Sequence, residues 1–316
     1  MAEQPDLTII IVNWNSAAYL QKCLASIYGN TKDLDFEVIV IDNASFDGCD
    51  EMIRREFPQV KFIQSKENLG FAKANNLGFG HAKGRNILFL NPDTEVVGSA
   101  IKELVSVLDT TPDAGIVGAK LLNSDLSVQT SCIKAFPTIL NQVLDADYLQ
   151  RLFPKSRLWG MRPLFEGDSR PATVDVVCGA CLMVKRAILE KVGLFTTDYF
   201  MYAEEVDLCY KVKQAGRETC YLREAIVIHH GGRSSAFRPG NNFANIAMQE
   251  SRLKFMKLRR GKLYAAVYRL TIAVAAMARL CLLRSFLALT LGRFRRPTLR
   301  VACDKWLRIF HWAACL

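Results

Sequence analysis

The sequence predicts an α/β fold in which a mixed, mainly parallel β-sheet is flanked by helices. Short β-branched runs alternate with amphipathic stretches over residues 7–90, which is typical of parallel strands joined by crossover helices. The runs are apolar on both faces, as expected for strands that helices cover on both sides. Half of the 316 residues are hydrophobic, which is enough for a buried core.

The first ninety residues contain four predicted strands and three predicted helices. Leu7–Val12 is a β-branched run that ends at a polar residue, and Ala17–Tyr28 follows with apolar residues three and four positions apart. These patterns predict a strand and then a helix. Proline ends the second helix, because its ring cannot continue one. The other strands are predicted at Phe36–Ile41, Val60–Ile63 and Asn86–Leu90, and the other helices at Cys49–Phe57 and Phe71–Ala82.

The rest of the body is less regular. Glycine follows two of its predicted helices and is expected to end them. Residues 122–173 have no clear period and are rich in turn residues. The helices are predicted at Ala100–Leu108, Ala187–Val192 and Glu204–Gln214, and the strands at Ile116–Leu121, Val174–Val177, Leu182–Val184 and Ala225–Ile228.

Polar side chains follow three of the predicted strands. Parallel sheets bind their ligands beyond the carboxyl ends of the strands. Asparagine and aspartate are also common turn residues, but three strand ends of the same character favour a site over three separate turns. The residues concerned are Asn13, Asn15, Asp42, Asn43, Asn91 and Asp93.

Three short motifs carry candidate chemistry. In Asn91-Pro92-Asp93-Thr94, a carboxylate after a strand can ligate Mg²⁺ or Mn²⁺ against a bound diphosphate. An Asn-Pro turn is the alternative. In the run from Tyr202 to Leu208, three acids begin a helix, where the helix dipole accounts for up to two of them. Neighbouring aromatic residues, Tyr199, Phe200 and Tyr202, would raise the proton affinity of a carboxylate, as a general base requires.

The third motif is the run His229-His230-Gly231-Gly232-Arg233-Ser234, which follows a strand. Imidazole can bind a metal ion, and arginine with backbone N–H groups can bind phosphate oxygens. Consecutive strand residues point to opposite faces, so we expect one histidine to face the ion. We favour His229.

These motifs, with several others, resemble glycosyltransferase family 2 of the GT-A fold, and most closely its rhamnosyltransferase-like branch, which acts in cell-surface polysaccharide assembly. The resemblance covers about residues 7–235. It rests on the segments Thr8–Asn15, Val40–Ser45, Glu67–Ala72 with Asn75-Asn76, Leu90–Thr94, Cys178–Cys181 and Phe200–Leu208.

The resemblance implies an inverting, metal-dependent transfer of a hexosyl group, such as rhamnose, from a nucleotide-diphosphate sugar. It implies that Asp93 is the main acidic ligand of Mg²⁺ or Mn²⁺ and that His229 is a second candidate ligand. The family's catalytic base is the Asp of a Glu-Asp pair, which reads Glu204-Glu205 here, so Glu205 is the expected base with Glu204 and Asp207 as competitors. The expected nucleotide-sugar contacts are Val12, Asn13, Asn15, Asp42, Asn68, Gly70, Phe71, Asn75, Asn91 and Pro92.

Charged residues are distributed unequally along the chain. The formal net charge is +10, and residues 252–316 hold 15 Lys and Arg residues against the single acid Asp304, which gives this tail +14 and the rest −4. A basic tail on an acidic body predicts a surface that meets phosphate groups, and a merely solvated basic face is the alternative. We therefore expect a transferase domain at 1–250 and a basic helical region at 251–316.

The segment Leu263–Gly292 is apolar but interrupted by arginine. Its longest run without a charge is Leu270–Ala278, nine residues, which is too short to span a bilayer. On a helical wheel Arg269, Arg279 and Arg284 fall within about 140°, which favours a helix lying in the interface of an anionic membrane. A packed helical subdomain, an oligomer contact and a true span are the alternatives.

Several of the ten cysteines lie inside apolar segments, which is typical of reduced thiols in a cytosolic protein. The polar start, Met1–Asp6, does not resemble a signal peptide. We expect a cytoplasmic protein, peripheral on the inner face of the cell membrane through residues 252–300, with a glycan or lipid-linked acceptor.

Two other functions compete with this reading. One is an inactive, membrane-attached scaffold or binding protein that has lost its base. The other is a nucleotidyltransferase, although the segment after the first strand lacks the glycine-rich phosphate loop of that class. Nucleic acid is not expected as a partner, because the body is acidic.

Overall fold

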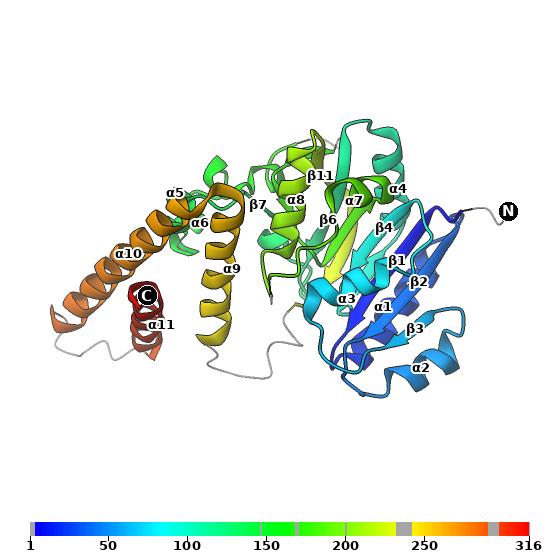
Figure 1. Ribbon diagram of the computed structural model, residues 1–316, viewed down its shortest axis with the longest axis horizontal. Coiled ribbons are helices and arrows are strands. Elements are labelled where there is room, and N and C mark those ends of the chain that lie inside the picture. The colour runs from blue at the N-terminus through cyan, green and yellow to red at the C-terminus, as the bar shows by residue number, and fades with distance from the viewer. Residues whose placement is uncertain are drawn as a thin grey trace. The chain divides into compact units, whose positions relative to one another are not determined.

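The chain forms two compact units (Figure 1). The computed structural model describes residues 4–145, 147–167, 171–199, 201–231, 242–289 and 297–315. Unit 1 consists of Met1–Phe136, Pro154–Phe200 and Glu204–Phe237, and unit 2 consists of Pro137–Phe153, Met201–Ala203 and Arg238–Leu316.

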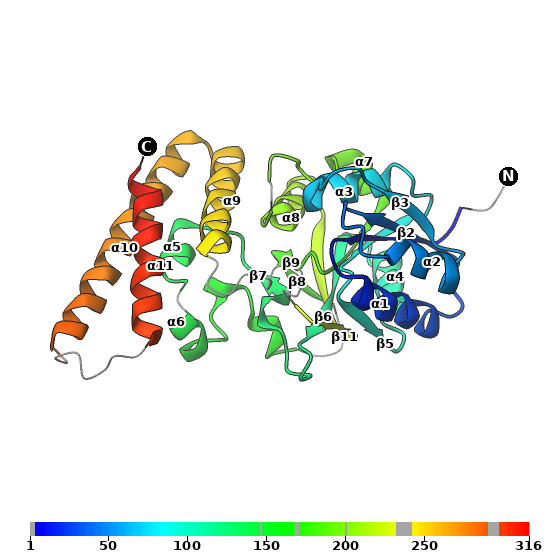
Figure 2. The same cartoon turned by 90° about the horizontal axis from the view of Figure 1, so that it is seen from below.

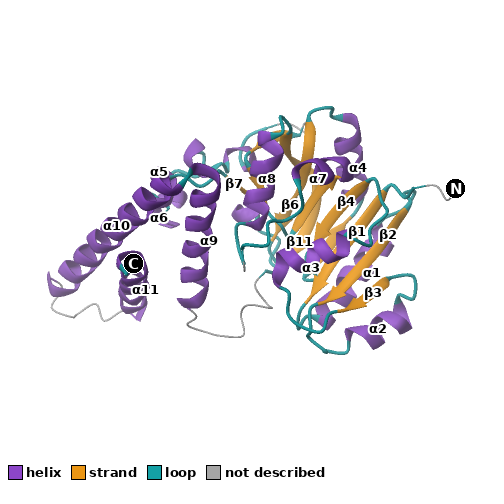
Figure 3. Ribbon diagram, in the orientation of Figure 1, coloured by secondary structure: helices purple, strands orange, loops and turns teal. Residues whose placement is uncertain are grey.

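Unit 1 contains a nine-stranded sheet in the order β3-β2-β1-β4-β10-β6-β11-β5, with β8 paired to β11. Figure 3 shows β3, β2, β1 and β4 side by side in this sheet. Six strands (β1, β2, β3, β4, β6 and β11) run one way and three (β5, β8 and β10) run the other. The predicted mixed, mainly parallel sheet is confirmed. The strands are β1 (Leu7–Asn13), β2 (Phe36–Asp42), β3 (Lys61–Gln64), β4 (Asn86–Leu90), β5 (Thr94–Val97), β6 (Ala114–Leu122), β8 (Ala172–Val174), β10 (Cys181–Lys185) and β11 (Glu218–His229).

Helices cover both faces of this sheet, and α1 and α3 lie on opposite sides of it (Figure 2). Leu20, Leu24 and Ile27 are the buried stripe of α1, as their spacing predicts. In α3, a Cβ on Gly78 would lie 2.5 Å from a methyl carbon of Ile10 in β1, so glycine allows this close approach. The helices are α1 (Ala17–Asn30), α2 (Cys49–Glu56), α3 (Gly70–Phe79), α4 (Ala100–Thr110), α7 (Arg186–Val192) and α8 (Glu204–Gln214).

The strand register brings the polar strand ends together. Asn13 at the end of β1 pairs with Asp42 at the end of β2, and Asp42 pairs with Gln64 at the end of β3. On the other side, Ile11 pairs with the last residue of β4, directly before Asn91. The expected ligand edge at the carboxyl ends of parallel strands is therefore present.

The structure corrects two of the predicted elements and adds a short strand to the sheet. The strand expected at Ala225–Ile228 begins at Glu218, because residues 218–222 pair with β6 before a register shift between Leu222 and Ile226. The strand expected at Val174–Val177 is divided into β8 and β9 (Val176–Val177), and β9 pairs with β7 (Ile133–Lys134) in a separate two-stranded sheet. The short strand β5 was not expected, because Asn91-Pro92 directly before it reads as a turn.

Unit 2 is helical, as expected for the C-terminal region. Its long helices, α9 (Asn242–Arg260), α10 (Lys262–Leu289) and α11 (Pro297–Ala314), pack against one another, and it also holds α5 (Ile139–Val143) and α6 (Asp147–Leu152). Two arginines lie on the packed side of α10: Arg269 donates to carbonyls at the end of α11, and Arg279 donates to the Val143 carbonyl and stacks 4.2 Å from the ring centroid of Trp306.

The opposite side of α10 is apolar and exposed. Exposed side chains recur every three or four residues, while buried ones line the packed side. Within the described residues, α10 is the one helix long and apolar enough to cross a membrane by length and composition alone. Residues 290–296, which include the basic cluster Arg293-Phe294-Arg295-Arg296, lie outside the described residues. The exposed face consists of Leu263, Val267, Leu270, Val274 and Met277.

Candidate active site

Asn13 and Asp42 form a buried polar pair at the ends of β1 and β2. Asn13 Nδ2 donates to Asp42 Oδ1 over 2.8 Å, and Gln64 Nε2 donates to Asp42 Oδ2 over 2.7 Å. Burial alone would raise the pKa of Asp42, but hydrogen bonds from Ser45, Gln64 and Asn13 outweigh it and lower the pKa. Asp42 is therefore an ionised acceptor, while Asn13 Oδ1 has no hydrogen-bond partner among the described residues.

Asp42 also belongs to a group of three metal-type ligands with Asp47 and Cys49. Both Asp42 oxygens already accept hydrogen bonds, and Asp47 Oδ2 accepts the backbone N–H groups of Ser16 and Ala17 at the start of α1. These bonds use the lone pairs that a cation would need. The group is thus better suited to stabilising the loop than to holding an ion.

The asparagine segment before α3 is tied to the same edge. Asn43 donates to Asn68 Oδ1 over 2.9 Å and accepts from the Leu69 backbone N–H over 2.8 Å. Gly70 has φ +73°, which explains glycine at this position. Asn75 is buried and donates to the Phe71 carbonyl within α3, so its amide stabilises the helix. Of the other expected contacts, Val12 packs against Ile39 and Ile41, and Asn15 is exposed with φ +51°.

Asp93 and His229 lie together at the other side of this edge. Thr94 of β5 pairs with His229 at the end of β11, and His229 Nε2 lies 3.4 Å from Asp93 Oδ1 and 3.4 Å from Asn91 Nδ2. Both side chains are largely buried. Carboxylate oxygen and imidazole nitrogen both ligate Mn²⁺-type ions, so this pair fits a divalent cation.

The second histidine points elsewhere, as the strand geometry predicts. His230 Nε2 lies 2.8 Å from Glu95 Oε1 and its Nδ1 lies 2.8 Å from Ser124 Oγ. His230 thus joins β11 to β5 and to the turn after β6. The remaining residues of this motif, Gly232, Arg233 and Ser234, lie outside the described residues, as does Phe200 of the acidic motif.

The three acids of α8 have different surroundings. Glu204 is 2% exposed, its Oε1 has no hydrogen-bond partner among the described residues, and burial with the nearby Glu205 charge raises its pKa to about 8. Asp207 is fully buried and accepts from Thr196 Oγ1 and Tyr199 OH. Glu205 is partly exposed, and its Oε1 lies 3.7 Å from Lys134 Nζ. Of the three carboxylates, Glu205 is the most accessible.

The turn at Cys178 and Gly179 lies next to Glu205 of α8. Burial raises the pKa of Cys178; the Lys134 charge opposes this shift, and the charges of Glu205 and Asp93 reinforce it. The backbone N–H of Asn91 donates to the Ala180 carbonyl over 3.0 Å, so the segment that carries Asp93 runs beside this turn. A Cβ on Gly179 would lie 3.5 Å from Glu205 Cβ and 3.6 Å from the Phe71 ring, which places Glu205 next to Phe71 at the head of α3. Glu205 and Phe71 thus border the Cys178-Gly179 turn, and the Asn91–Asp93 segment adjoins the next residue, Ala180.

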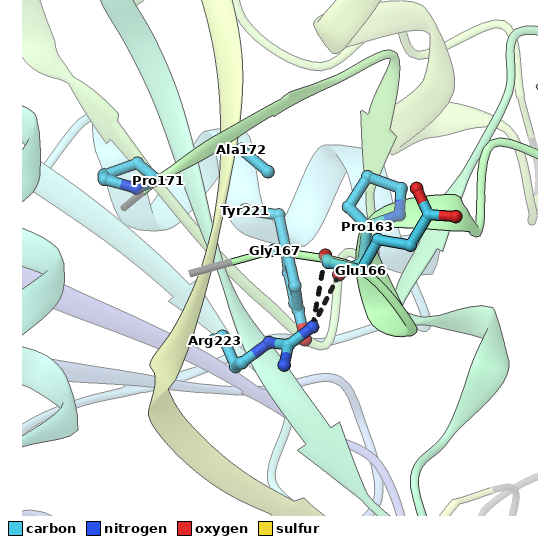
Figure 4. Close-up of a pocket in the computed structure, with 7 residues that line it drawn as sticks. All are labelled: Pro163, Glu166, Gly167, Pro171, Ala172, Tyr221 and Arg223. Atoms are coloured by element: carbon cyan, nitrogen blue, oxygen red, sulfur yellow. Dashed lines mark hydrogen bonds between the residues drawn. The ribbon is translucent and has the colours of Figure 1, made fainter. Parts of the chain in front are cut away.

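A cavity of about 330 Å³ lies elsewhere in unit 1 (Figure 4). Arg223 donates to the Pro163 and Glu166 carbonyls there. None of its lining residues comes from the strand ends that carry Asp93, His229 or Glu205. They are Pro163, Glu166, Gly167, Pro171, Ala172, Tyr221 and Arg223.

Two residues near the site were not expected from the sequence. Lys134 and Gln129, whose Oε1 lies 2.8 Å from His229 Nδ1, come from the irregular segment that follows β6. They carry no motif, and only the pairing of β7 with β9 and of β6 with β11 brings them to the strand ends. The sequence holds no local signal for either residue.

Comparisons with known proteins identify the family of this chain. A model described as glycosyl transferase family 2 matches residues 8–193. The chain is 28% identical over 252 residues to N-acetylglucosaminyl-diphospho-decaprenol L-rhamnosyltransferase of Mycobacterium tuberculosis (strain ATCC 25618 / H37Rv), covering 75% of this chain and 80% of that protein. It is 24% identical over 249 residues to rhamnosyltransferase WbbL of Escherichia coli (strain K12), covering 73% of this chain and 88% of that protein.

Solved structures share the fold. The mannosyltransferase PcManGT of Pyrobaculum calidifontis, solved with GDP-Man and Mn²⁺, has a TM-score of 0.60 at 21% identity and covers 99% of this chain and 87% of that one. GalNAc-T7, solved with UDP, GalNAc and Mn²⁺, has a TM-score of 0.59 at 16% identity. The match covers 81% of this chain and 48% of that one. These likenesses support the predicted GT-A fold. The chain belongs to glycosyl transferase family 2, in its rhamnosyltransferase-like branch.

Proposed function

We propose that this glycosyltransferase transfers a hexosyl group, such as rhamnose, with inversion from a nucleotide-diphosphate sugar to a hydroxyl of a glycan or lipid-linked acceptor. The observation that carries the proposal is that Asp93 with His229, and Glu205, lie along the same short segment, Cys178-Gly179-Ala180. A cation-binding pair and an accessible carboxylate along one segment are the two parts that such a transfer requires.

In this proposal Asn13 and Asp42 contact the donor nucleotide. Asn13 Oδ1, which lacks a partner among the described residues, accepts a hydrogen bond from the sugar or base, and the Asp42 carboxylate holds the Asn13 amide in place. Asn68, with the α3 N-terminal residues Gly70 and Phe71, contacts the nucleotide from the same edge of the sheet. Asp93 and His229 would hold Mg²⁺ or Mn²⁺, and a cation bound there would supply positive charge to stabilise the departing diphosphate.

Glu205 acts as the general base. It takes the proton of the acceptor hydroxyl while the oxygen attacks the anomeric carbon from the face opposite the diphosphate. Glu204 is disfavoured as the base, because its side chain is 2% exposed and an acceptor hydroxyl reaches the partly exposed Glu205 more easily. Asp207 is disfavoured because Thr196 and Tyr199 occupy its oxygens in the core.

A donor panel tests the proposal. Purified enzyme is incubated with dTDP-rhamnose, UDP-sugars or GDP-sugars and lipid extract, and nucleoside diphosphate release is measured with Mn²⁺ or with a chelator. We expect release with one donor class, loss of release with the chelator, and loss in Asp93→Ala. Glu95→Gln is the matched control, because Glu95 contacts His230 instead of His229.

The outcomes separate the competing functions. Absence of release with every donor, despite donor binding, would favour an inactive scaffold. Formation of a nucleotide sugar from a sugar phosphate and a nucleoside triphosphate would favour a nucleotidyltransferase. If Asp93→Ala still released nucleoside diphosphate, Asp93 would not be required for the reaction.

We further propose that unit 2 attaches the enzyme to an anionic membrane, peripheral on the cytoplasmic face. Support comes from the exposed apolar face of α10 and from basic residues beside it, Lys257, Arg259 and Arg260 in the last turn of α9 and Lys262 at the start of α10. Apolar side chains with adjacent cations suit the interface of an anionic bilayer. In this arrangement 1–250 performs the transfer and 251–316 brings it to a lipid-linked acceptor.

A further inference from the structure

The second ring nitrogen of His229 begins a chain of hydrogen bonds that leads away from the site. His229 Nδ1 lies 2.8 Å from Gln129 Oε1, and Gln129 Nε2 donates to Asn123 Oδ1 over 3.1 Å. Asn123 Nδ2 donates to Ser127 Oγ over 2.9 Å, and Ser127 Oγ donates to Asp125 Oδ1 over 2.5 Å. The turn from Asn123 to Ser127, closed by two backbone hydrogen bonds, holds the last three side chains together.

The donor-to-acceptor direction of these hydrogen bonds is fixed at Asp125, where the series ends. An ionised carboxylate only accepts hydrogen bonds, and hydrogen bonds from the hydroxyl and backbone N–H of Ser127 lower the pKa of Asp125. Ser127 must then donate to Asp125, and each group before it donates in turn. Reversing the direction of the hydrogen bonds would require the side-chain amides of Gln129 and Asn123 to flip. It would also break the hydrogen bond from the Ser127 hydroxyl to Asp125.

The same direction determines the tautomer of His229. Gln129 Oε1 is an acceptor, so Nδ1 of a neutral ring carries the hydrogen and Nε2 carries the lone pair. Asn91 Nδ2 lies 3.4 Å from this Nε2, where it can donate. In this tautomer, Nε2 and Asp93 Oδ1 face each other across 3.4 Å as two electron-pair donors, an arrangement that a cation between them stabilises.

We propose that Gln129 is a positioning residue that holds His229 in the Nδ1–H tautomer and so prepares its Nε2 to ligate the cation together with Asp93. The proposal rests on the proposed metal site and adds the residue that orients its nitrogen ligand. Outer hydrogen-bond partners of this kind typically change metal affinity by about 10- to 100-fold.

The test uses the full chain and two readouts. Imidazole ¹⁵N shifts of the metal-free protein, at a pH where the ring is neutral, report the tautomer of His229. The chain has four histidines, so a His229→Gln variant identifies the signal. Mn²⁺ affinity is then measured by electron paramagnetic resonance for wild type, Gln129→Met and Gln129→Glu. Ser124→Ala is the control from the same turn, because Ser124 contacts His230.

We expect the Nδ1–H tautomer in wild type, a mixture of tautomers in Gln129→Met, and Mn²⁺ binding weakened about 10- to 100-fold in that variant. Gln129→Glu keeps an acceptor and should restore both readouts to near wild type, and Ser124→Ala should change neither. An Nε2–H tautomer in wild type, or equal Mn²⁺ affinity in wild type and Gln129→Met, would overturn the proposal. If wild type has the expected tautomer but binds no Mn²⁺, the metal site itself is wrong, and the role of Gln129 toward a cation is overturned with it.

Discussion

Lys134 Nζ lies 3.7 Å from Glu205 Oε1, whereas the adjacent Glu204 is buried with an unpartnered oxygen within the described part of the chain. From this difference we predict that Glu205→Gln lowers kcat by about 10²- to 10⁴-fold, the usual contribution of a general base. Donor affinity should change little, because Glu205 acts on the acceptor. Nucleoside diphosphate release at saturating donor measures kcat, and calorimetry measures donor affinity.

Two variants at the same turn of α8 control this prediction. Glu205→Asp keeps a carboxylate and has the residue type that the family resemblance expects, so it should retain more activity than Glu205→Gln. Glu204→Gln should lose far less than Glu205→Gln, because the buried carboxyl of Glu204 is already protonated at neutral pH. If Glu204→Gln were as inactive as Glu205→Gln, the assignment of the base would be wrong.

The buried carboxyl of Glu204 should also make stability depend on pH. Its pKa is raised from 4.5 to about 8 in the folded chain, mainly by burial, so the folded state binds the proton more tightly than the unfolded state. This contribution to stability is complete below pH 4.5 and is lost as pH rises from about 4.5 to about 8. Each pKa unit corresponds to about 1.4 kcal/mol, so the total change is on the order of a few kcal/mol.

Glu204→Gln should remove this part of the pH dependence. A neutral amide of the same shape has no proton to lose, so the variant should gain stability relative to wild type between pH 5 and pH 9. Urea unfolding at the two pH values measures the difference in the free energy of unfolding. Parallel pH profiles for the two proteins would mean that Glu204 ionises in the folded state as readily as in the unfolded state.

The strand-end motifs could be predicted because each is local. A strand followed by Asn13, Asp42 or Asn91 can be recognised from a few residues, and the parallel register then brings these ends to one edge. The family resemblance added the expectation that Asp93 is the main acidic ligand and that Glu205 is the base. Cys23, Cys181, Cys209 and Cys220 are buried free thiols, as their apolar surroundings predict.

The remaining parts of the site depend on pairing between distant segments. Antiparallel β10 inserts between β4 and β6, and β5 pairs with β11 more than a hundred residues later. Neither pairing leaves a local pattern, since strand partners are chosen by packing over the whole sheet. The contacts of Lys134 with Glu205 and of Gln129 with His229 follow from such pairings. The role of Asp207 was also undecidable from the sequence, because Thr196 and Tyr199, which bind it, lie in an irregular loop.

Gly84 should be essential for the start of the sheet. A Cβ at this position would lie 2.3 Å from the Thr8 backbone N and 2.5 Å from the Leu7 carbonyl carbon, and main-chain atoms in β1 cannot move aside without breaking the pairing of β1 with β4. We expect Gly84→Ala to destabilise unit 1 by at least about 2 kcal/mol. Urea unfolding measures the change.

Gly29 provides the matched control for Gly84. It lies in α1, and a Cβ there would have nothing within 4 Å. Gly29→Ala should therefore be neutral or stabilising by up to about 1 kcal/mol, because alanine is the better helix former. Equal effects of the two substitutions would contradict the close contact inferred at Gly84.

The exposed face of α10 should govern membrane binding. Leu270 and Val274 are 68% and 62% exposed in the charge-free middle of this face, so placing acids there adds polar groups where acyl chains would lie. We expect Leu270→Glu/Val274→Glu to lower binding to phosphatidylcholine–phosphatidylglycerol vesicles by more than about tenfold, since each buried Leu or Val side chain contributes about 1.5–3 kcal/mol. Vesicle flotation measures the bound fraction.

Three comparisons distinguish interfacial membrane binding from a membrane span or a protein contact: the lipid composition, the salt concentration and the position of the substitution. Val301→Glu is the control, because Val301 is equally exposed but lies on α11. Wild type should bind less to pure phosphatidylcholine vesicles and less at high salt, because the basic residues beside α10 attract anionic headgroups and salt screens them. Binding that resists both salt and carbonate washing would indicate that α10 spans the bilayer. A double variant that binds as well as wild type would show that this face is not the membrane contact. If wild type forms an oligomer that the double variant does not form, this face contacts protein instead.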